Sequence, residues 1–214
     1  MKSEIAAIRK EYSSQQLLEK NVAANPIDQF ELWWQHVINA QIVEPNAMTV
    51  ATASADGMPS ARVILLKGFD SNGFVFYTNY KSYKAMQLEE NPRACIVFHW
   101  KELERQVRIT GLVSKVPADE SDAYFNSRPE GSRIGAWVSP QSQVIESRDW
   151  LDTRFENIAK EMAGEHVQRP PYWGGYIVTP VIMEFWQGRP SRLHDRIQYT
   201  LLENGRWKIE RLAP

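Results

Sequence analysis

Cationic side chains interrupt an apolar, strand-like segment between Arg62 and Lys67. Arginine and lysine are rarely buried unless an anion pairs with them, so the segment predicts an anionic ligand nearby. An ordinary strand whose terminal cations extend to solvent would give the same pattern. Because an odd separation places Arg62 and Lys67 on opposite faces of a regular strand, they either bind different anions or are brought together by a bulge.

A second cation stands at an expected helix start. Ser82 is a typical N-cap residue, and Lys84 falls in the first turn, where a positive charge opposes the helix dipole. A bound anion would reverse that penalty, so the pair suggests a phosphate site, to which Tyr77 and Thr78 at the end of the preceding strand add donors. A capped turn with a solvated lysine is the alternative.

Two further groups carry donors for anions. Tyr124, Arg128 and Ser132 recur in steps of four and offer a phenol, a guanidinium and a hydroxyl, which suits a second phosphate. In the segment 192–196, the two arginines and the histidine share one face if the chain is extended. Three basic groups on one face favour an anionic or electron-rich ligand, although a cationic surface strand would look the same.

Common cofactor and metal motifs are missing from the sequence. It has no Gly-x-Gly-x-x-Gly, no Walker loop, no His-Glu-x-x-His and no paired cysteine motif. Cys95 and His99 could share a strand face, but two ligands without a third predict no metal site. The single cysteine lies in the apolar run 94–98, so we expect a packed core thiol.

The elements that position these residues are mostly strands. A polar N-terminal helix over 3–20 and an aromatic-rich helix over 27–43 are expected first. Hairpin-connected strands follow, and the expected ranges are 48–54, 60–69, 74–78, 93–100, 104–117, 173–186, 192–202 and 206–212. Short helices should begin at Ser82, Ala118 and Ser147, with a loop over 127–139. The pattern predicts a mainly β fold with helical additions (α+β), built on an antiparallel barrel.

Length and composition limit the function classes. The chain has 214 residues, 43% of them apolar, and a net charge of −1. We expect one domain over residues 21–214, preceded by an arm over 1–20. The near-zero charge argues against a nucleic-acid-binding protein, and the longest apolar run of five residues is far shorter than the ~20 that span a bilayer. A cytoplasmic protein without a membrane partner is therefore expected.

Many separated motifs carry a resemblance that runs through nearly the whole chain. They are RVILLK at 62–67, FYTN at 76–79, ERQV at 104–107, SRP at 127–129, IGAWVS at 134–139, QS at 141–142, YWGG at 172–175, EFWQG at 184–188, RLHDR at 192–196 and the terminal RLAP. In this order the sequence resembles the pyridoxine/pyridoxamine 5′-phosphate oxidase family. The resemblance implies an antiparallel FMN-binding split β-barrel of Greek-key type, working as a homodimer with FMN at the interface.

The resemblance also implies an activity and assigns residues to it. Pyridoxine or pyridoxamine 5′-phosphate would be oxidised to pyridoxal 5′-phosphate, with O2 as acceptor and H2O2 as product. FMN would bind to Arg62, Val63, Ile64, Leu65, Leu66, Lys67, Tyr77, Thr78, Lys84, Gln106, Gln141, Ser142, Trp186 and Arg196. The substrate would bind to Arg9, Lys10, Glu11, Tyr12, Lys67, Tyr124, Arg128, Ser132, Arg192, Leu193 and His194, with residues 9–12 as a lid. The catalytic residues would be Arg192 and His194.

One position departs from the family pattern. Many members have a second arginine immediately before the lysine of the phosphate-binding helix, where this chain has Tyr83. We hypothesise that Lys81 supplies the missing charge. Two alternative functions remain at this point: a related split-barrel flavin reductase, which would not need the second phosphate group, and a carrier that binds flavin or pyridoxal phosphate without turnover.

Overall fold

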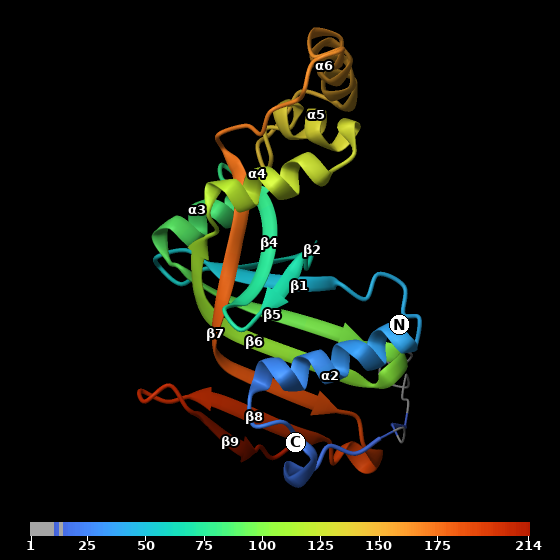
Figure 1. Cartoon of the computed structure of the whole chain (residues 1–214), viewed down its shortest axis with the longest axis vertical. Helices are drawn as coiled ribbons and strands as arrows, with labels where there is room; N and C mark the ends of the chain where they lie inside the picture. The colour runs from blue at the N-terminus through green and yellow to red at the C-terminus, as the bar shows by residue number, and fades with distance from the viewer. Residues whose placement is uncertain (1–10, 13–14) are drawn as a thin grey trace, which may run out of the picture.

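The computed structural model describes residues 11, 12 and 15–214, which form one nine-stranded antiparallel sheet with helices packed around it (Figure 1). The strands are β1 (Ala47–Ala53), β2 (Pro59–Leu65), β3 (Gly68–Asp70), β4 (Gly73–Asn79), β5 (Arg93–Trp100), β6 (Arg105–Lys115), β7 (Trp173–Gln187), β8 (Asp195–Leu201) and β9 (Trp207–Arg211). Their order is β2-β1-β5-β6-β7-β4-β3, and β8 pairs with β7 and β9. The sheet curls into the split half-barrel.

The 15-residue strand β7 organises the sheet. One of its edges pairs with β6 along almost its whole length. The other edge pairs with β4 over Trp173–Val178 and with β8 over Ile182–Gln187. In Figure 1, β7 therefore runs from the helices at one end of the molecule to the β8–β9 hairpin at the other. Residues at the two ends of β7 therefore pack against different elements, β4 at one end and β8 at the other.

Helix α2 (Pro26–Asn39) covers the main core. It begins where the Asn25 side chain accepts a hydrogen bond from the Ile27 N–H at 2.8 Å, with proline at the first helical position. The fully buried Phe30 ring lies 4.9 Å from both Phe69 and Phe74. These contacts fix α2 against the sheet by apolar burial.

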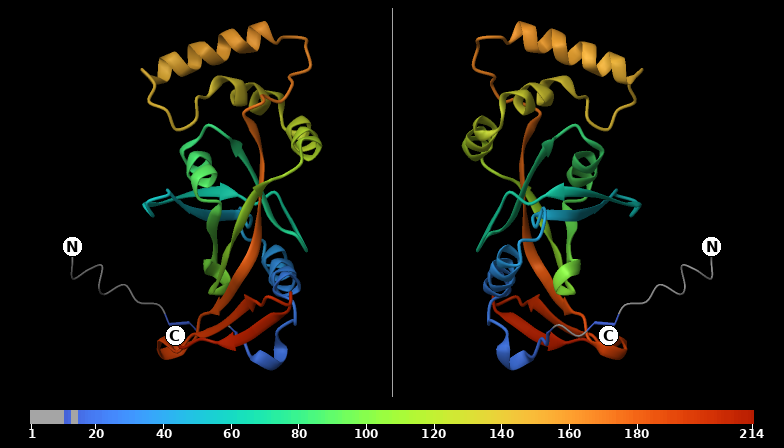
Figure 2. Two further views of the ribbon diagram at one scale, coloured as in Figure 1. Left: turned by 90° about the vertical axis from the view of Figure 1, so that its left-hand side faces the viewer. Right: turned by 90° about the vertical axis from the view of Figure 1, so that its right-hand side faces the viewer.

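The remaining helices are α3 (Tyr83–Glu90), α4 (Ala118–Ser127), α5 (Glu130–Val138) and α6 (Arg148–Glu161), and short 3₁₀ turns occupy Glu19–Asn21, Lys101–Leu103 and Pro190–Arg192. Of these helices, α3 packs on β1, and α4, α5 and α6 gather around the N-terminal end of β7. Phe125, Ile134, Val138 and Trp173 form a second, smaller core between α4, α5 and β7. Figure 2 shows α6 lying across α5, on the side away from the sheet.

Several expected elements were wrong in detail. The stretch 127–139, expected to be a loop, contains α5, because Ile134, Ala136 and Val138 bury against the second core. The single strand expected over 60–69 is broken between β2 and β3. The arm helix expected over 3–20 is not continued through residues 15–18, which are irregular, and residues 1–10, 13 and 14 lie outside the described part.

Other expectations need smaller corrections. The strand expected over 192–202 begins only at Asp195. Nine strands are found in the described ranges, rather than seven or eight. Cys95 is half-buried rather than fully packed, because β5 alternates between buried and half-buried positions. No helix in the described ranges is long and apolar enough to cross a bilayer.

Candidate functional site

A cavity of about 550 Å³ lies between β2 and the start of α3. Its lining residues are Arg62, Val63, Ile64, Tyr83, Lys84, Gln141 and Ser142. We call this the β2–α3 site. Six of the seven lining residues were predicted to bind FMN, and the structure brings them together from three separate segments. The seventh is Tyr83, where many family members have arginine.

Lys84 is buried in this site without a carboxylate. Its Nζ donates to Thr78 Oγ1 at 3.1 Å and to Ser82 Oγ at 3.5 Å, so the Ser82 side chain holds the lysine and does not cap the helix. No ion pair between described residues includes Lys84 or Arg62. Burial, reinforced by the charge of Arg62, lowers the pKa of Lys84 to about 8. An anion bound here would offset both the loss of solvation of Lys84 and its repulsion by Arg62.

Arg62 is held by neutral acceptors. Its Nη1 donates to Thr52 Oγ1 at 2.7 Å, and its Nη2 donates to Ser60 Oγ at 2.6 Å. Both hydroxyls in turn donate to the side-chain oxygen of the buried Gln87, each at 2.6 Å. Burial lowers the pKa of Arg62, and no described side chain neutralises it.

Gln141 links the β2–α3 site to a neighbouring cavity. Its side-chain oxygen accepts hydrogen bonds from Thr78 Oγ1 at 3.2 Å and from the Asn79 N–H at 3.3 Å. It also lines a cavity of about 310 Å³ together with Arg128, Ser132 and Trp173. We call this second cavity the α4–α5 site, and Gln141 makes the two sites adjacent.

Arg128 is the main cation of the α4–α5 site. Its guanidinium lies 4.6 Å from the Trp173 ring centroid and 5.4 Å from that of Phe125. The Arg128 Nη1 is buried without a hydrogen-bond partner, and burial lowers the pKa of this side chain. A buried donor without a partner is costly, so the site is arranged for an acceptor that a ligand would bring.

The predicted substrate residues Tyr124 and Lys67 lie beside this site. The Tyr124 ring stacks on Tyr77 with centroids 3.9 Å apart, and Lys67 Nζ lies 6.0 Å from the Tyr124 ring. Lys67 is exposed and follows the end of β2, so the break between β2 and β3, and not a regular strand, sets its position relative to Arg62. Leu65 ends β2 and Leu66 is buried in the main core.

A third group of predicted residues lies at the opposite end of β7. Across the sheet, Gln106 on β6 pairs with Trp186 on β7, which pairs with Arg196 on β8. Arg196 donates Nε to Glu184 Oε1 at 2.8 Å and Nη2 to Oε2 at 3.2 Å. Arg108 also contacts this buried carboxylate, at 3.1 Å. We call this group, with His194 and Tyr12, the β7–β8 site.

The His194 ring has a defined hydrogen-bonding state. Its Nδ1 accepts the backbone N–H of Arg189 at 3.1 Å, so in the neutral ring the proton is on Nε2. Burial and the charge of Arg192 lower the pKa of His194, which favours that neutral ring. The ring centroid lies 4.6 Å from Trp186 and 5.8 Å from Tyr12. His194 is thus oriented as a donor through Nε2.

The turn before His194 corrects the prediction of a shared strand face. Ser191 and Arg192 have left-handed backbones, with φ of 56° and 60°, and lie in a 3₁₀ turn. Arg192 and His194 therefore do not alternate with Arg196 along a strand. Leu193 is 69% exposed. Such backbones in non-glycine residues store strain and are concentrated at functional sites.

Glu11 and Tyr12 are the described part of the expected lid. A Cβ atom on Gly188 would lie 2.8 Å from Tyr12 Cβ, so only glycine at position 188 lets the tyrosine pack here. The Tyr12 ring packs edge-on against the Trp186 ring, with the two ring centroids 5.7 Å apart. Glu11 is exposed, and Arg9 and Lys10 lie outside the described residues.

The β7–β8 site is not close to the other two sites within one chain. Tyr77 and Thr78 pair with Gly175 and Gly174 near the start of β7, whereas Arg196 pairs with Trp186 near its end. At about 3.3 Å per residue, the positions of Gly175 and Trp186 lie roughly 35 Å apart along the strand. Figure 1 shows β4 along one end of β7 and β8 along the other. The predicted residues thus divide into two half-sites.

The comparisons with known proteins decide the family. Residues 35–161 match the family model described as pyridoxamine 5'-phosphate oxidase, and residues 173–214 match that of the pyridoxine 5'-phosphate oxidase C-terminal dimerisation region. The chain belongs to the pyridoxamine 5′-phosphate oxidase family. It is therefore a member of an oxidoreductase family with the FMN-binding split-barrel fold, as its sequence motifs predicted.

Relatives and solved structures agree with this assignment. The chain is 53% identical over the full length of both chains to a pyridoxine/pyridoxamine 5'-phosphate oxidase of Nostoc punctiforme. It is 55% identical to one of Bordetella petrii, over 98% of this chain and 99% of the relative. The crystal structure of PhzG from Burkholderia lata matches with a TM-score of 0.88 at 30% identity, covering 94% of this chain and 100% of that one. An FMN-binding protein of Nostoc punctiforme shares the fold, with a TM-score of 0.74 at 19% identity, covering 90% and 100%.

Sequence reasoning missed two buried side chains that hold predicted site residues. Gln87 lies behind Arg62, and Glu184 lies behind Arg196. Glu184 had a detectable signal, because an acidic residue in an otherwise apolar strand needs a cationic partner. Gln87 had none, since a glutamine on a short helix is usually exposed. For Lys81, the structure gives no support to a compensating role: its Nζ lies over the Tyr172 ring, at 4.8 Å.

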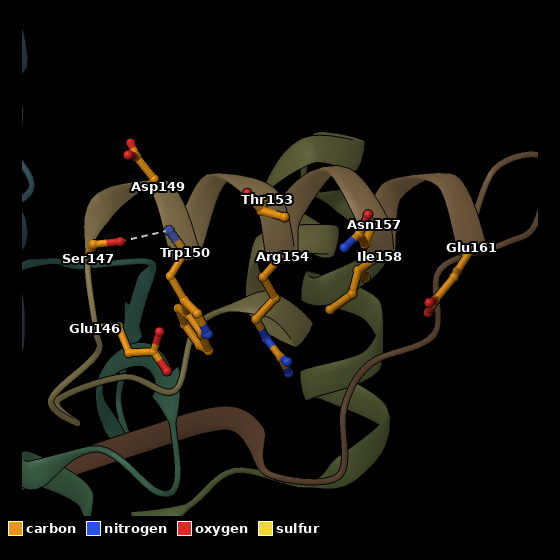
Figure 3. A pocket seen from close by; sticks show the side chains of 9 residues that line it. All are labelled: Glu146, Ser147, Asp149, Trp150, Thr153, Arg154, Asn157, Ile158 and Glu161. Carbon is orange, nitrogen blue, oxygen red and sulfur yellow. Dashed lines mark hydrogen bonds between the residues drawn. The ribbon is translucent and has the colours of Figure 1, made fainter.

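Another cavity lies along α6, away from these sites. It measures about 740 Å³, and in Figure 3 the side chains of Trp150, Arg154 and Glu161 point to one side of the helix, whereas Asp149 points to the other. Its lining mixes acidic, basic and apolar side chains, so it does not favour one class of ligand. No group of three or more possible metal ligands occurs among residues 11–12 and 15–214.

Proposed function

We propose that the protein oxidises pyridoxine 5′-phosphate and pyridoxamine 5′-phosphate to pyridoxal 5′-phosphate, using FMN as cofactor and O2 as electron acceptor and releasing H2O2. The relatives named above support this reaction. The observation that carries it is the pair of adjacent cavities whose cations, the buried Lys84 with the half-buried Arg62 and then the half-buried Arg128, have no carboxylate partner among the described residues. Two neighbouring anion sites suit two phosphorylated ligands.

The β2–α3 site fits the phosphate of FMN. Lys84 and Arg62 supply two cations, and Ser142 and Gln141 add polar groups at the rim of the same cavity. The neutral hydroxyl partners of Lys84 and Arg62 leave both charges available for a dianion, since Lys84 is protonated below its pKa of about 8. The positions that the family resemblance assigns to FMN therefore have the chemistry that the cofactor needs.

The cofactor site would be completed by a second copy of the chain. Gln106, Trp186 and Arg196 lie at the far end of β7 from Lys84, so one flavin mononucleotide does not reach both half-sites of one chain. A homodimer in which each chain contributes one half-site resolves the separation. The match of residues 173–214 to a dimerisation region supports this arrangement, because these residues carry most of the β7–β8 site.

The substrate phosphate would bind in the α4–α5 site. Arg128 has a free buried donor, and Ser132, Tyr124 and Lys67 lie around it. Arg192 and His194 of the partner subunit's half-site would contact the pyridine ring. Residues 9–12 would close over it, with Tyr12 already packed on the ring of His194.

The chain itself would act by binding, orientation and exclusion of water. FMN held by the residues named above would supply the redox chemistry, namely acceptance of the hydride from the 4′ carbon and two-electron reduction of O2 to H2O2. His194 would donate a hydrogen bond from Nε2 to the substrate, because its Nδ1 accepts the Arg189 N–H. This geometry makes His194 a donor to the substrate and not the base that removes the hydroxyl or amine proton. The rings of Trp186 and Tyr12 pack against the ring of His194 and would shield part of it from water.

An anaerobic spectrum tests the proposed reaction. The FMN-loaded protein should lose its visible flavin absorbance on addition of pyridoxine 5′-phosphate, and unphosphorylated pyridoxine at the same concentration should not bleach it. Bleaching by a reduced nicotinamide but not by the phosphate ester would identify a flavin reductase instead. Ligand binding without bleaching by either donor would identify a carrier.

A further inference from the structure

The hydrogen-bond network behind Arg62 has a fixed direction. Thr52 Oγ1 and Ser60 Oγ each donate their single hydrogen to the same oxygen of Gln87, at 2.6 Å. Each hydroxyl therefore has only lone pairs left for Arg62, which donates to both. The Gln87 side-chain N–H is used on the Met58 carbonyl at 3.3 Å, which fixes which end of the amide faces the hydroxyls.

The network is also neutral. Gln87 and Thr52 are 2% and 3% exposed, and neither carries a charge. A glutamate at position 87 would accept the same two hydrogen bonds but would bring a negative charge behind Arg62, in a poorly solvated place where charges interact strongly. The amide orients the guanidinium without neutralising it.

Neutrality matters more in this chain because of Tyr83. The β2–α3 cavity is lined by two cations, Arg62 and Lys84, and position 83 adds a phenol rather than a charge. Lys81 is directed to the Tyr172 ring. A carboxylate at position 87 would therefore halve the net charge that the lining offers to a phosphate.

We propose that Gln87 is a positioning residue that gives the β2–α3 site its preference for a phosphorylated flavin, by orienting Arg62 through Thr52 and Ser60 while adding no charge. Gln87 does not touch the cavity, whose lining residues do not include it. The inference rests on the proposed FMN site. It adds that the selectivity for the phosphate depends on an uncharged residue that reaches Arg62 only through two hydroxyl groups.

The test compares FMN with riboflavin, which lacks the phosphate, by quenching of flavin fluorescence on the purified apoprotein. Gln87→Glu should weaken FMN binding at least about tenfold and leave riboflavin affinity within about twofold. Tyr83→Arg in the Gln87→Glu background should recover most of the loss, because it restores the second net charge. Gln168→Glu, at an exposed position, makes the same charge change elsewhere and should alter neither affinity.

A second set of variants keeps the test decisive if Gln87→Glu does not fold, as judged by circular dichroism. Thr52→Val with Ser60→Ala removes the two hydroxyl acceptors of Arg62, while the Val50 carbonyl still accepts from Nη1 at 3.3 Å, and should also weaken FMN binding selectively. Adding Gln87→Met to that pair should cause no further loss, since Gln87 acts through the two hydroxyls. Unchanged FMN affinity in folded Gln87→Glu, or an equal loss of riboflavin affinity, would overturn the inference. Wild-type protein that binds FMN no better than riboflavin would instead overturn the proposed cofactor site.

Discussion

The two ends of β7 hold their cations in opposite ways. At the β2–α3 site, Lys84 and Arg62 contact hydroxyls and no described carboxylate. At the β7–β8 site, Arg196 forms a two-bond pair with the buried Glu184, and Asp195 pairs with Arg211 at 2.7 Å. One end keeps its positive charge available, whereas the other neutralises it within the fold.

This difference separates two tasks of a binding site. An uncompensated buried cation destabilises the empty protein but binds a phosphate strongly, because the ligand supplies the missing charge. A compensated arginine contributes little net charge but has a fixed orientation, which suits hydrogen bonding to a planar, nearly neutral ring. FMN, the proposed cofactor, has both kinds of group: a charged phosphate and a planar, nearly neutral ring.

The largest expected effect comes from removing the uncompensated cation. Lys84→Met should weaken FMN binding about 100-fold, since a charge-assisted hydrogen bond is worth about 2–3 kcal/mol, and should raise the thermal stability of the apoprotein by removing a buried charge. Fluorescence titration and calorimetry measure the two effects. Lys208→Met, at a solvent-exposed ion pair with Glu210, is the control. Loss of stability in apo Lys84→Met would contradict the comparison.

The opposite end should respond in the opposite way. Glu184→Gln leaves Arg196 and Arg108 without their carboxylate and should lower the free energy of unfolding of the apoprotein by about 2 kcal/mol. Denaturant unfolding of the apoprotein measures the change. Glu210, which forms a solvent-exposed ion pair with Lys208, offers a matched control. Glu210→Gln should lower the free energy of unfolding by well under about 1 kcal/mol. Equal effects of the two changes would show that burial of the Glu184 pair is unimportant.

The pKa of Lys84 predicts how pH sharpens the contrast. Its pKa is about 8 in the folded apoprotein against 10.5 for an ordinary lysine, so between these values the unfolded chain binds more protons. The contribution of Lys84 to apoprotein stability therefore becomes more favourable as pH rises from 8 to 10.5. FMN affinity should fall over the same window, by up to about tenfold per pH unit, because binding requires the protonated lysine. Lys84→Met should abolish this slope in titrations between pH 7 and 9.5.

The smallest expected effect tests whether the β7–β8 site works through hydrogen-bond geometry. In His194→Gln the amide N–H can replace the Nε2 donor, whereas in His194→Asn the shorter side chain can only replace the Nδ1 acceptor of the Arg189 N–H. His194→Gln should retain several-fold more turnover than His194→Asn. Nitrogen NMR of the wild-type ring should show the proton on Nε2 at neutral pH. A proton on Nδ1 would contradict the donor role.

Much of the fold followed from local sequence patterns. The hairpins at Ala55–Gly57, Asp70–Gly73 and Glu203–Gly205 were correctly located, because turn residues and alternating apolar strands are short-range signals. Helix α5 was missed, since its apolar residues are buried by packing against Phe125 and Trp173, which lie on other elements. The break after β2 was also missed.

The sequence by itself determined the family, because its motifs are strings of neighbouring residues such as RVILLK and RLHDR. It also located the cations that need an anion, since charge in an apolar segment is visible without coordinates. Only the tertiary structure decided which cations are neutralised. Glu184 lies 12 positions before Arg196, and Gln87 lies 25 positions after Arg62, so their pairing depends on strand register and helix packing. The same long-range contacts placed the two half-sites at opposite ends of β7.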